Sequence, residues 1–211
     1  MKKCVVIQAN GNNERMSKFF PQPKYELFYN GKKIIHHIID NAKRLECDVY
    51  VVLNKKTKIN FDTTGINVVL VDSTKFRIET LSKCFENFRN YNEVIIHDCD
   101  VIIPYESLKK LSGDGITVTN YKYDGLKYGF VMLDENFEFI KGNEKTEESG
   151  HITTGAYSVN YKKFENFIKN NNYTDSFWDY YNNSKKVNLV FTKNSINLGD
   201  INSYMNNLWS L

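Results

Sequence analysis

Two cations and two carboxylates in this chain have the types and positions that phosphate chemistry needs. Arg15 and Lys24 follow a short apolar run at 3–8, and Asp98 and Asp100 lie at the end of another, EVIIHD at 93–98. A guanidinium offers a fork of donors to phosphate oxygens, and a lysine offers a compact positive charge. Two neighbouring carboxylates repel each other unless a cation lies between them, and Mg²⁺ prefers such oxygen ligands. These residues indicate a site for a phosphate-bearing substrate with Mg²⁺.

The two aspartates alternate along the end of a predicted strand, in the triplet Asp98-Cys99-Asp100. Alternation along a strand directs both carboxylates to the same side. The other interpretation is two exposed turn aspartates close to Pro104.

The loop after the first apolar run is built from small and polar residues. Gly11 reaches positive φ without a steric cost, and asparagine tolerates it better than most residues, so Asn10, Asn12 and Asn13 suit a loop that approaches phosphates closely. In open α/β sheets, ligands bind outside the carboxyl ends of the strands. This loop is therefore the first candidate for nucleotide binding, although an ordinary Asn/Gly loop has the same composition.

Strands and helices alternate in the first half of the chain. Apolar runs predict strands, and apolar residues at helical spacing predict helices. In the first half the strands are 3–8, 48–54, 66–72 and 93–98, and the helices are 33–45, 77–88 and 105–111. In the second half the strands are 116–121, 127–133, 137–141, 151–160 and 186–192, and the helices are 162–169, 175–183 and 201–211. The pattern predicts an α/β fold: a mostly parallel central sheet with helices on both faces, and a mixed β part in the second half.

Length and composition bound the class of protein. The chain has 211 residues with 41% hydrophobic content, enough for one core, so we expect a single domain over 1–211. The net charge of +3 gives no basis for nucleic-acid binding. No apolar stretch approaches the roughly 20 residues that cross a bilayer, and the N-terminal run is too short for a signal peptide, so we expect no membrane partner and a cytoplasmic location. The four cysteines form no C-x-x-C pair, which indicates reduced thiols.

Several motifs, in order, resemble one enzyme family. The segment ANGNNERM resembles the A-x-G-x-G-x-R-M/L signature of the sugar-phosphate nucleotidyltransferases, a GT-A-like family, and PKYELFYNGKKIIHHII is similar to the family's P-K segment. The family's later segments resemble KFRIETL, IIHDCDVI, GNEKTEESGHITTGAYSV and INLGDINSYMNNL. The resemblance covers nearly the whole chain and implies a Rossmann-like nucleotide-binding half at about 1–112 and an acceptor-binding half at about 113–211.

The resemblance implies a reaction in which a phosphorylated acceptor attacks the α-phosphorus of a nucleoside triphosphate and pyrophosphate leaves. Arg15 would hold the leaving phosphates, Lys24 the α-phosphate and Lys145 the attacking phosphate. Asp100, with Asp98 or Asp200, would bind Mg²⁺. The implied nucleotide-binding residues are Gln8, Ala9, Asn10, Gly11, Asn12, Asn13, Arg77, Glu79 and Asp98. The implied acceptor-binding residues are Glu144, Lys145, Gly155 and Tyr157.

The substrates are left open by the sequence. The triphosphate could be CTP, UTP, GTP or dTTP, and the acceptor a sugar phosphate or phosphocholine, giving a building block for a surface polysaccharide such as a capsule. The closing segment YMNNLWSL could pack on the chain's own core or on a second copy, so a homodimer also stays open.

The chain departs from the family pattern at two places. Asn13 replaces the second loop glycine and Asn10 a small residue, and the added amides could change the base that is accepted. Near the C-terminus, Asn197 matches the second metal-binding aspartate, with Asp200 three residues later. Either Asp200 takes the role, or the second carboxylate is missing.

Two other functions stay open. The Asp98-Cys99-Asp100 triplet also resembles that of GT-A-type glycosyltransferases, which use a nucleotide sugar, although such a site does not need both Arg15 and Lys24. The substitutions at Asn13 and Asn197 would also suit a non-catalytic subunit that binds nucleotide sugars. Among the histidines, His97 borders the aspartates and could orient one carboxylate.

Overall fold

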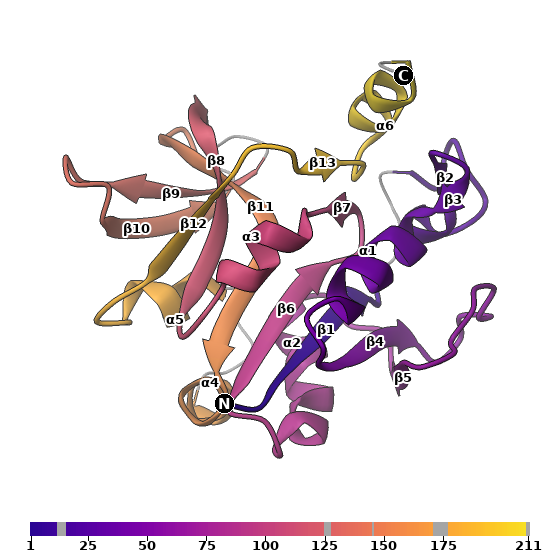
Figure 1. The fold of residues 1–211 in the computed structure, drawn as a ribbon, viewed down its shortest axis with the longest axis horizontal. Helices are drawn as coiled ribbons and strands as arrows, with labels where there is room; N and C mark the ends of the chain where they lie inside the picture. Colours follow the sequence, from indigo (N-terminus) through magenta and orange to yellow (C-terminus); the bar gives the residue numbers. More distant parts are fainter. Residues whose placement is uncertain (12–15, 125–127, 145, 171–176, 210–211) are drawn as a thin grey trace.

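One large mixed sheet organises the molecule, with helices on both of its faces (Figure 1). The computed structural model describes residues 1–11, 16–124, 128–144, 146–170 and 177–209. The α/β class predicted from the alternation of elements is confirmed.

The first half of the chain forms the parallel part of the sheet. β1 (Lys3–Ala9) lies between β4 (Asp48–Asn54) and β6 (Glu93–Asp98), and β5 (Asn67–Val71) continues beyond β4. All three pairings are parallel. Because the chain moves from β1 to β4 on one side and later to β6 on the other, the strand order reverses between β1 and β6. Such a switch point opens a crevice at the carboxyl ends of the two strands.

The second half adds antiparallel strands to the same sheet. β11 (Ser149–Asn160) pairs with β6 and also contacts β8 (Gly115–Asp124) and β9 (Gly129–Leu133). β10 (Phe139–Glu144) extends the sheet beyond β9, and β12 (Asn188–Thr192) runs parallel to β8. The long strand β11 therefore joins the two halves.

Alternation along β1 divides its side chains between two cores. Val5 and Ile7 pack with α1 (Ile34–Lys43) and α3 (Tyr105–Lys110) on one face. Cys4 and Val6 pack on the other face with α2 (Arg77–Cys84), α4 (Tyr161–Asn170) and α5 (Phe177–Asn182). Burial on both faces is what a continuous apolar run predicts for a central parallel strand.

The short elements near the sheet edge carry site residues. Lys24 opens the 3₁₀ helix η1 (Lys24–Glu26), directly after Pro23. β2 (Phe28–Tyr29) and β3 (Lys32–Lys33) follow as a hairpin, whose Asn30 and Gly31 have φ of 47° and 72°. Two successive positive φ values are typical of the type I′ turn that an Asn-Gly pair predicts.

Several predicted boundaries differ from the structure. The predicted helix 77–88 is two elements, because α2 ends at Cys84 and the 3₁₀ helix η2 (Phe85–Phe88) follows. β7 (Val101–Ile102) and β13 (Ile196–Asn197), an antiparallel pair, were not expected. In α6 (Ile201–Trp209), Tyr204 is buried, whereas Met205 faces outward with 36% exposure.

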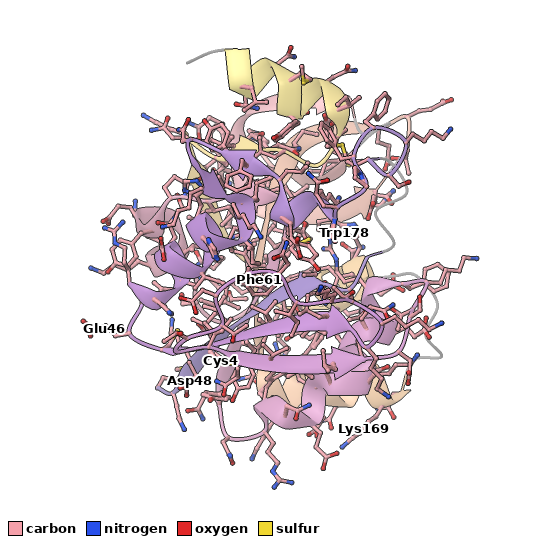
Figure 2. All side chains as sticks on the ribbon, turned by 90° about the vertical axis from the view of Figure 1, so that its right-hand side faces the viewer. Cys4, Glu46, Asp48, Phe61, Lys169 and Trp178 are labelled. Carbon is pink, nitrogen blue, oxygen red and sulfur yellow. The ribbon has the colours of Figure 1, made fainter. Side chains whose placement is uncertain are left out.

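Glycines let α5 pack closely on the acceptor half. A Cβ at Gly142 would lie 2.1 Å from the Trp178 ring, and one at Gly129 would lie 2.9 Å from it. Asn182 also donates to the Gly142 carbonyl and accepts from its N–H. Figure 2 places Trp178 inside the molecule, whereas Lys169 projects at the periphery. Among the helices that the structure describes, none is both long and apolar enough to cross a membrane.

Candidate active site

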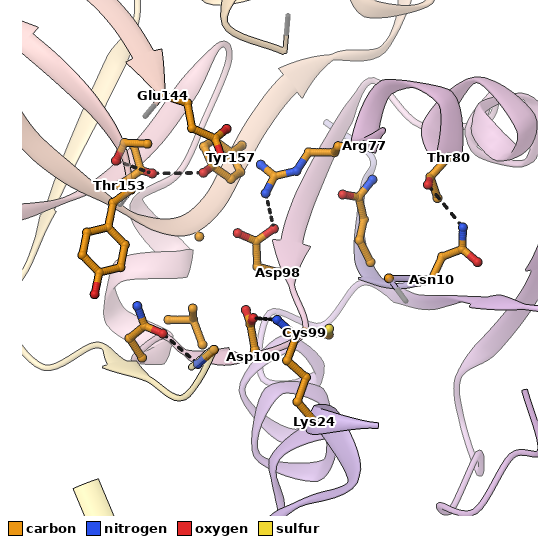
Figure 3. A pocket seen from close by; sticks show the side chains of 18 of the residues that line it. Asn10, Lys24, Arg77, Thr80, Asp98, Cys99, Asp100, Glu144, Thr153 and Tyr157 are labelled. Atoms are coloured by element: carbon orange, nitrogen blue, oxygen red, sulfur yellow. Dashed lines mark hydrogen bonds and ion pairs between the residues drawn. The ribbon is translucent and has the colours of Figure 1, made fainter. Parts of the chain in front are cut away.

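A cavity of about 410 Å³ opens at the switch point, at the carboxyl ends of β1 and β6. Its lining comes from every region that the sequence motifs marked: the loop after β1, the start of α2, the end of β6, the strands β9 to β11, and the segment before α6. Figure 3 shows Asn10 and Thr80 on one side, Thr153, Tyr157 and Glu144 on the other, and Asp98 and Asp100 between them.

One side of the cavity is built by β1 and α2. Asn10 is buried at 3% exposure and donates through Nδ2 to the hydroxyls of Thr74, at 2.9 Å, and Thr80, at 3.3 Å. Gln8 and Phe76 also line this side. It therefore combines amides, hydroxyls and one aromatic ring.

Arg77, the first residue of α2, reaches the centre of the cavity. Its Nη2 lies 2.8 Å from Oδ1 of Asp98, and its guanidinium lies 5.1 Å from the centre of the Tyr157 ring and 5.2 Å from that of Phe177. Burial raises the pKa of Asp98 to about 6, and the nearby Asp100 also raises it, whereas Arg77 lowers it. Although burial opposes it, the charge of Asp98 raises the pKa of Arg77 above its ordinary value, so Arg77 is a fixed cation.

The second carboxylate has a different cation. Asp100 forms an ion pair with Lys24, and both side chains are largely buried. β6 ends at Asp98, so Asp100 lies in the turn before β7 and not on the strand. Both carboxylates nevertheless line the cavity, each with its own cation.

Gly155 in β11 is explained by its close approach to Asp98. Its φ is +89°, and a Cβ there would lie 3.1 Å from Oδ2 of Asp98 and 3.3 Å from Cγ2 of Val101. The close approach expected from a glycine inside a strand is therefore to the chain's own carboxylate.

Asn197 and Asp200 differ in what they contact. The Asn197 Oδ1 accepts from the Gly199 N–H, and a Cβ at Gly199 would lie 3.2 Å from this oxygen and 2.7 Å from Oδ2 of Asp100. The Asp200 carboxylate instead accepts from the backbone N–H and the hydroxyl of Ser203, at 2.9 and 2.8 Å, as an N-cap of α6. The amide of Asn197 thus lies beside Asp100, whereas the carboxylate of Asp200 caps the N-terminus of α6.

The far side of the cavity belongs to the second half of the chain. The Tyr157 hydroxyl lies 3.1 Å from Oγ1 of Thr153, and Glu144 ends β10 nearby (Figure 3). Tyr128 and Gly129 complete this side.

The comparisons with known proteins agree with this architecture. No family model matches the chain. The bifunctional protein GlmU of Clostridium botulinum strain Kyoto is 24% identical over 200 residues, which cover 86% of this chain and 43% of GlmU. The chain spans less than half the length of such curated relatives.

Two solved structures share the fold over nearly the whole chain. A candidate glucose-1-phosphate thymidylyltransferase from Bacillus anthracis has a TM-score of 0.82 at 16% identity, covering 99% of this chain and 94% of its own. The CTP:phosphocholine cytidylyltransferase of Streptococcus pneumoniae has a TM-score of 0.73 at 15% identity, covering 98% and 97%. The resemblance to the sugar-phosphate nucleotidyltransferases is confirmed.

The nucleotidyltransferase motifs and the cavity overlap at most of the described positions. Residues that the motifs marked and that line the cavity are Gln8, Asn10, Gly11, Lys24, Arg77, Asp98, Asp100, Glu144, Gly155, Tyr157 and Asp200. Asn12, Asn13, Arg15 and Lys145 lie outside the described residues.

Two marked residues lie away from the cavity lining. Ala9 is buried at the end of β1. The Glu79 carboxylate accepts from the Lys75 N–H at 2.9 Å and from Lys83 at 3.0 Å on the surface of α2. Glu79 therefore stabilises the first turn of its helix.

Sequence reasoning missed the threonines. Thr74, Thr80 and Thr153 line the cavity. Thr80 and Thr153 lie inside segments that resemble the family's motifs but at positions that the motifs do not mark, and the partner of Thr74 and Thr80 is Asn10, 64 and 70 residues away in the sequence. His97 also differs from expectation, because its Nδ1 contacts the Asp98 backbone carbonyl at 2.6 Å and not a carboxylate. All four cysteines are free.

Proposed function

We propose that this protein is a nucleotidyltransferase that joins a nucleoside triphosphate to a phosphorylated acceptor and releases pyrophosphate. The observation that carries the proposal is the two-sided cavity at the switch point, with Lys24 and Arg77 held by partly buried carboxylates between its sides. The nucleotide would occupy the side formed by Asn10 and Thr80, and the acceptor the side formed by Glu144 and Tyr157.

The chemistry needs positioning and charge neutralisation more than a strong base. An oxygen of the acceptor phosphate is already a nucleophile, so it attacks the α-phosphorus in line while the bond to the leaving pyrophosphate breaks. Lys24 would stabilise the charge that develops at the α-phosphate. Arg15 and Lys145 would hold the leaving and attacking phosphates, as the family motifs imply.

The residues that would hold a divalent cation are Asp100 and Asn197. A Cβ at residue 199 would lie 2.7 Å from the Asp100 oxygen and 3.2 Å from the Asn197 oxygen, so glycine lets the backbone pass close to both. One carboxylate and one amide oxygen suit Mg²⁺, which is usually bound by one or two carboxylates together with substrate phosphates. When bound, the ion would neutralise phosphate charge. Among the described residues, no three His, Cys, Asp or Glu side chains form a separate metal cluster, which agrees with a site that the substrate completes.

Asp98 has a different role in this proposal. Its carboxylate forms an ion pair with Arg77, so in this proposal it would position that cation beside the nucleotide.

The first test is a ligand screen by thermal unfolding. ATP, CTP, GTP, UTP and dTTP would each be added with Mg²⁺, beside a panel of nucleotide sugars. A ligand that binds only the native state, at 100 times its Kd, adds about 2.7 kcal/mol to the free energy of unfolding. We expect one triphosphate to stabilise the protein most. Stabilisation by a nucleotide sugar and by no triphosphate would instead favour a glycosyltransferase or a binding subunit.

The second test measures pyrophosphate release. The stabilising triphosphate is supplied with sugar 1-phosphates and with phosphocholine, the kinds of acceptor that the names of the structural neighbours carry. We expect turnover with one acceptor and a loss of roughly 100-fold or more in Lys24→Met, the size seen when a transition-state donor is removed. Lys55→Met is the control, because Lys55 lies on the surface. Equal turnover in both variants would exclude the role given to Lys24.

A further inference from the structure

Two buried amide atoms on the β1 and α2 side of the cavity have no hydrogen-bond partner among the described residues. They are Nε2 of Gln8 and Oδ1 of Asn10. Both residues line the cavity, and Asn10 is 97% buried. Buried polar atoms are nearly always hydrogen-bonded, so each exception needs a reason, and a bound ligand is one.

A chain of hydrogen bonds orients the Asn10 amide. The Thr80 hydroxyl lies 3.3 Å from the Phe76 carbonyl and donates to it, and the Thr74 hydroxyl, 2.5 Å from the Thr80 oxygen, donates to that oxygen in turn. Both threonine hydrogens are then used, so their oxygens accept the two Nδ2 hydrogens of Asn10. Within the part of the chain that the structure describes, the network thus leaves Oδ1 of this amide without a partner.

The second amide offers the opposite polarity. Gln8 is the register partner of Asp98 on the neighbouring strand, so it lies at the same cavity edge, near the end of β1 and two residues before Asn10. Its Nε2, which has no partner among residues 1–11, 16–124, 128–144, 146–170 and 177–209, is a donor. This side of the cavity therefore presents one buried acceptor and one buried donor, with the Phe76 ring also in its lining.

We propose that these two side chains read the base of the bound nucleotide: Oδ1 of Asn10 accepts an N–H of the base, and Nε2 of Gln8 donates to a carbonyl or ring nitrogen. The inference rests on the proposed function and goes beyond the backbone contacts that the family motif implies. The ligand group is a base edge that carries a donor and an acceptor side by side.

Such a pair discriminates between bases that exchange amino and keto groups. Cytosine and uracil differ by exchanging donor and acceptor at neighbouring positions, and so do adenine and guanine. With its polarity set by the threonines, Asn10 cannot rotate to suit both members of a pair. The wrong member places two acceptors or two donors face to face, which a buried site rejects.

The test compares base discrimination with phosphate binding. Kd values for CTP, UTP, ATP and GTP, and for inorganic tripolyphosphate, are measured with Mg²⁺ by calorimetry on the wild type, Asn10→Ala and Gln8→Leu. We expect the wild type to prefer one member of an amino/keto pair by about tenfold or more, the discrimination that one bidentate contact supplies. In both variants that ratio falls several-fold, while the Kd for tripolyphosphate stays unchanged.

The threonine network gives an independent variant. Thr80→Val removes the hydroxyl that holds Asn10, so the amide can rotate and the ratio falls, whereas Thr80→Ser keeps the hydroxyl and restores it. Circular dichroism confirms folding, and if Asn10→Ala does not fold, Gln8→Leu and Thr80→Val decide the question.

Each outcome has one meaning. Unchanged ratios in all the folded variants overturn the inference, as does an equal loss of affinity for every ligand including tripolyphosphate, since that would show a structural role. If the wild type binds neither a triphosphate nor tripolyphosphate, the proposed function itself fails. If it binds them without preference for a base, the proposed function stands and only the inference is overturned.

Discussion

At the scale of single residues, Gly155 is the position where backbone strain and the site meet. Its positive φ and the short space to Asp98 both disfavour a side chain. We expect Gly155→Ala to lower the free energy of unfolding by about 2 kcal/mol and to weaken triphosphate binding by displacing Asp98. Urea unfolding and calorimetric titration with the preferred triphosphate measure the two effects.

Gly113 provides the matched control for this prediction. It also has positive φ, +62°, but a Cβ there meets nothing within 4 Å. Gly113→Ala should therefore cost about 1 kcal/mol from backbone strain alone and leave nucleotide binding unchanged. Equal costs at the two glycines would contradict the contact that we assign to Asp98.

His97 predicts a pH dependence of stability. Burial lowers its pKa from 6.5 to about 4, so its ring is neutral in the folded state, and its Nε2 is buried without a partner among the described residues. Between pH 6.5 and about 4, His97 binds a proton in the unfolded state but not in the folded state. The contribution of His97 to the free energy of unfolding is therefore present above pH 6.5 and is lost as the pH falls toward 4. Its size is about 3 kcal/mol.

The measurement is a difference between two proteins. Asp98, with its raised pKa, acts in the opposite direction below pH 6, so urea unfolding of the wild type is compared with that of His97→Leu at pH 4.5, 5.5, 6.5 and 7.5. We expect the stability of the wild type to fall relative to the variant as the pH is lowered. Parallel pH profiles would show that His97 is not buried neutral.

At the scale of elements, the segment before α6 holds a capping aspartate, Asp200, and the proposed metal ligand Asn197. Asp200 accepts two hydrogen bonds from Ser203, whereas Asn197 lies beside Asp100. We expect Asp200→Ala to cost about 1 kcal/mol of stability, as for other N-caps, and to keep the Mg²⁺ dependence of nucleotide binding. Asp100→Asn should lose that dependence and Asn197→Asp should retain it. Calorimetric titration of the triphosphate with and without EDTA measures this Mg²⁺ dependence in each variant. If Asp200→Ala loses the dependence, Asp200 would be the metal ligand.

Asp114, directly before β8, links the helices α4 and α5 to the start of that strand. Its buried carboxylate accepts from the Tyr180 hydroxyl and from Lys163, both at 2.5 Å, and from the Asn160 N–H at 3.2 Å. Asp114→Ala would leave the buried tyrosine hydroxyl without an acceptor, so we expect a loss of about 2 kcal/mol in urea unfolding. Asp72→Ala removes only an exposed ion pair with Lys55 and should change stability by less than about 1 kcal/mol. Similar losses of stability in the two variants would contradict the structural role that we give to Asp114.

At the scale of the whole molecule, the shared sheet predicts one cooperative unit. β11 pairs with β6, so the nucleotide side and the acceptor side of the cavity belong to one hydrogen-bonded sheet. We expect urea unfolding followed by tryptophan fluorescence, which includes Trp178 in the acceptor half, to coincide with unfolding followed by far-UV circular dichroism. Two separated transitions would indicate two domains that unfold independently.

Much of the fold could be predicted from local patterns. The strands DVYVVLN and EVIIHD are β4 and β6 with unchanged bounds, because a buried parallel strand is a continuous apolar run bounded by polar residues. Pairs such as β7 with β13 could not be predicted, since each has two residues and their partners lie far apart in the chain. Such short strands carry no periodicity.

The candidate site, like the fold, could be predicted from the sequence only in part. By itself the sequence determined which residue types could do the chemistry, because Lys24, Asp98 and Asp100 lie in motifs where type and spacing are local properties. Only the tertiary structure decided how they pair: Arg77 with Asp98, Lys24 with Asp100, and Asn10 with two threonines of another element. These pairings depend on how β1, β6 and α2 are placed in space, and that placement results from the burial of apolar side chains over the whole sheet.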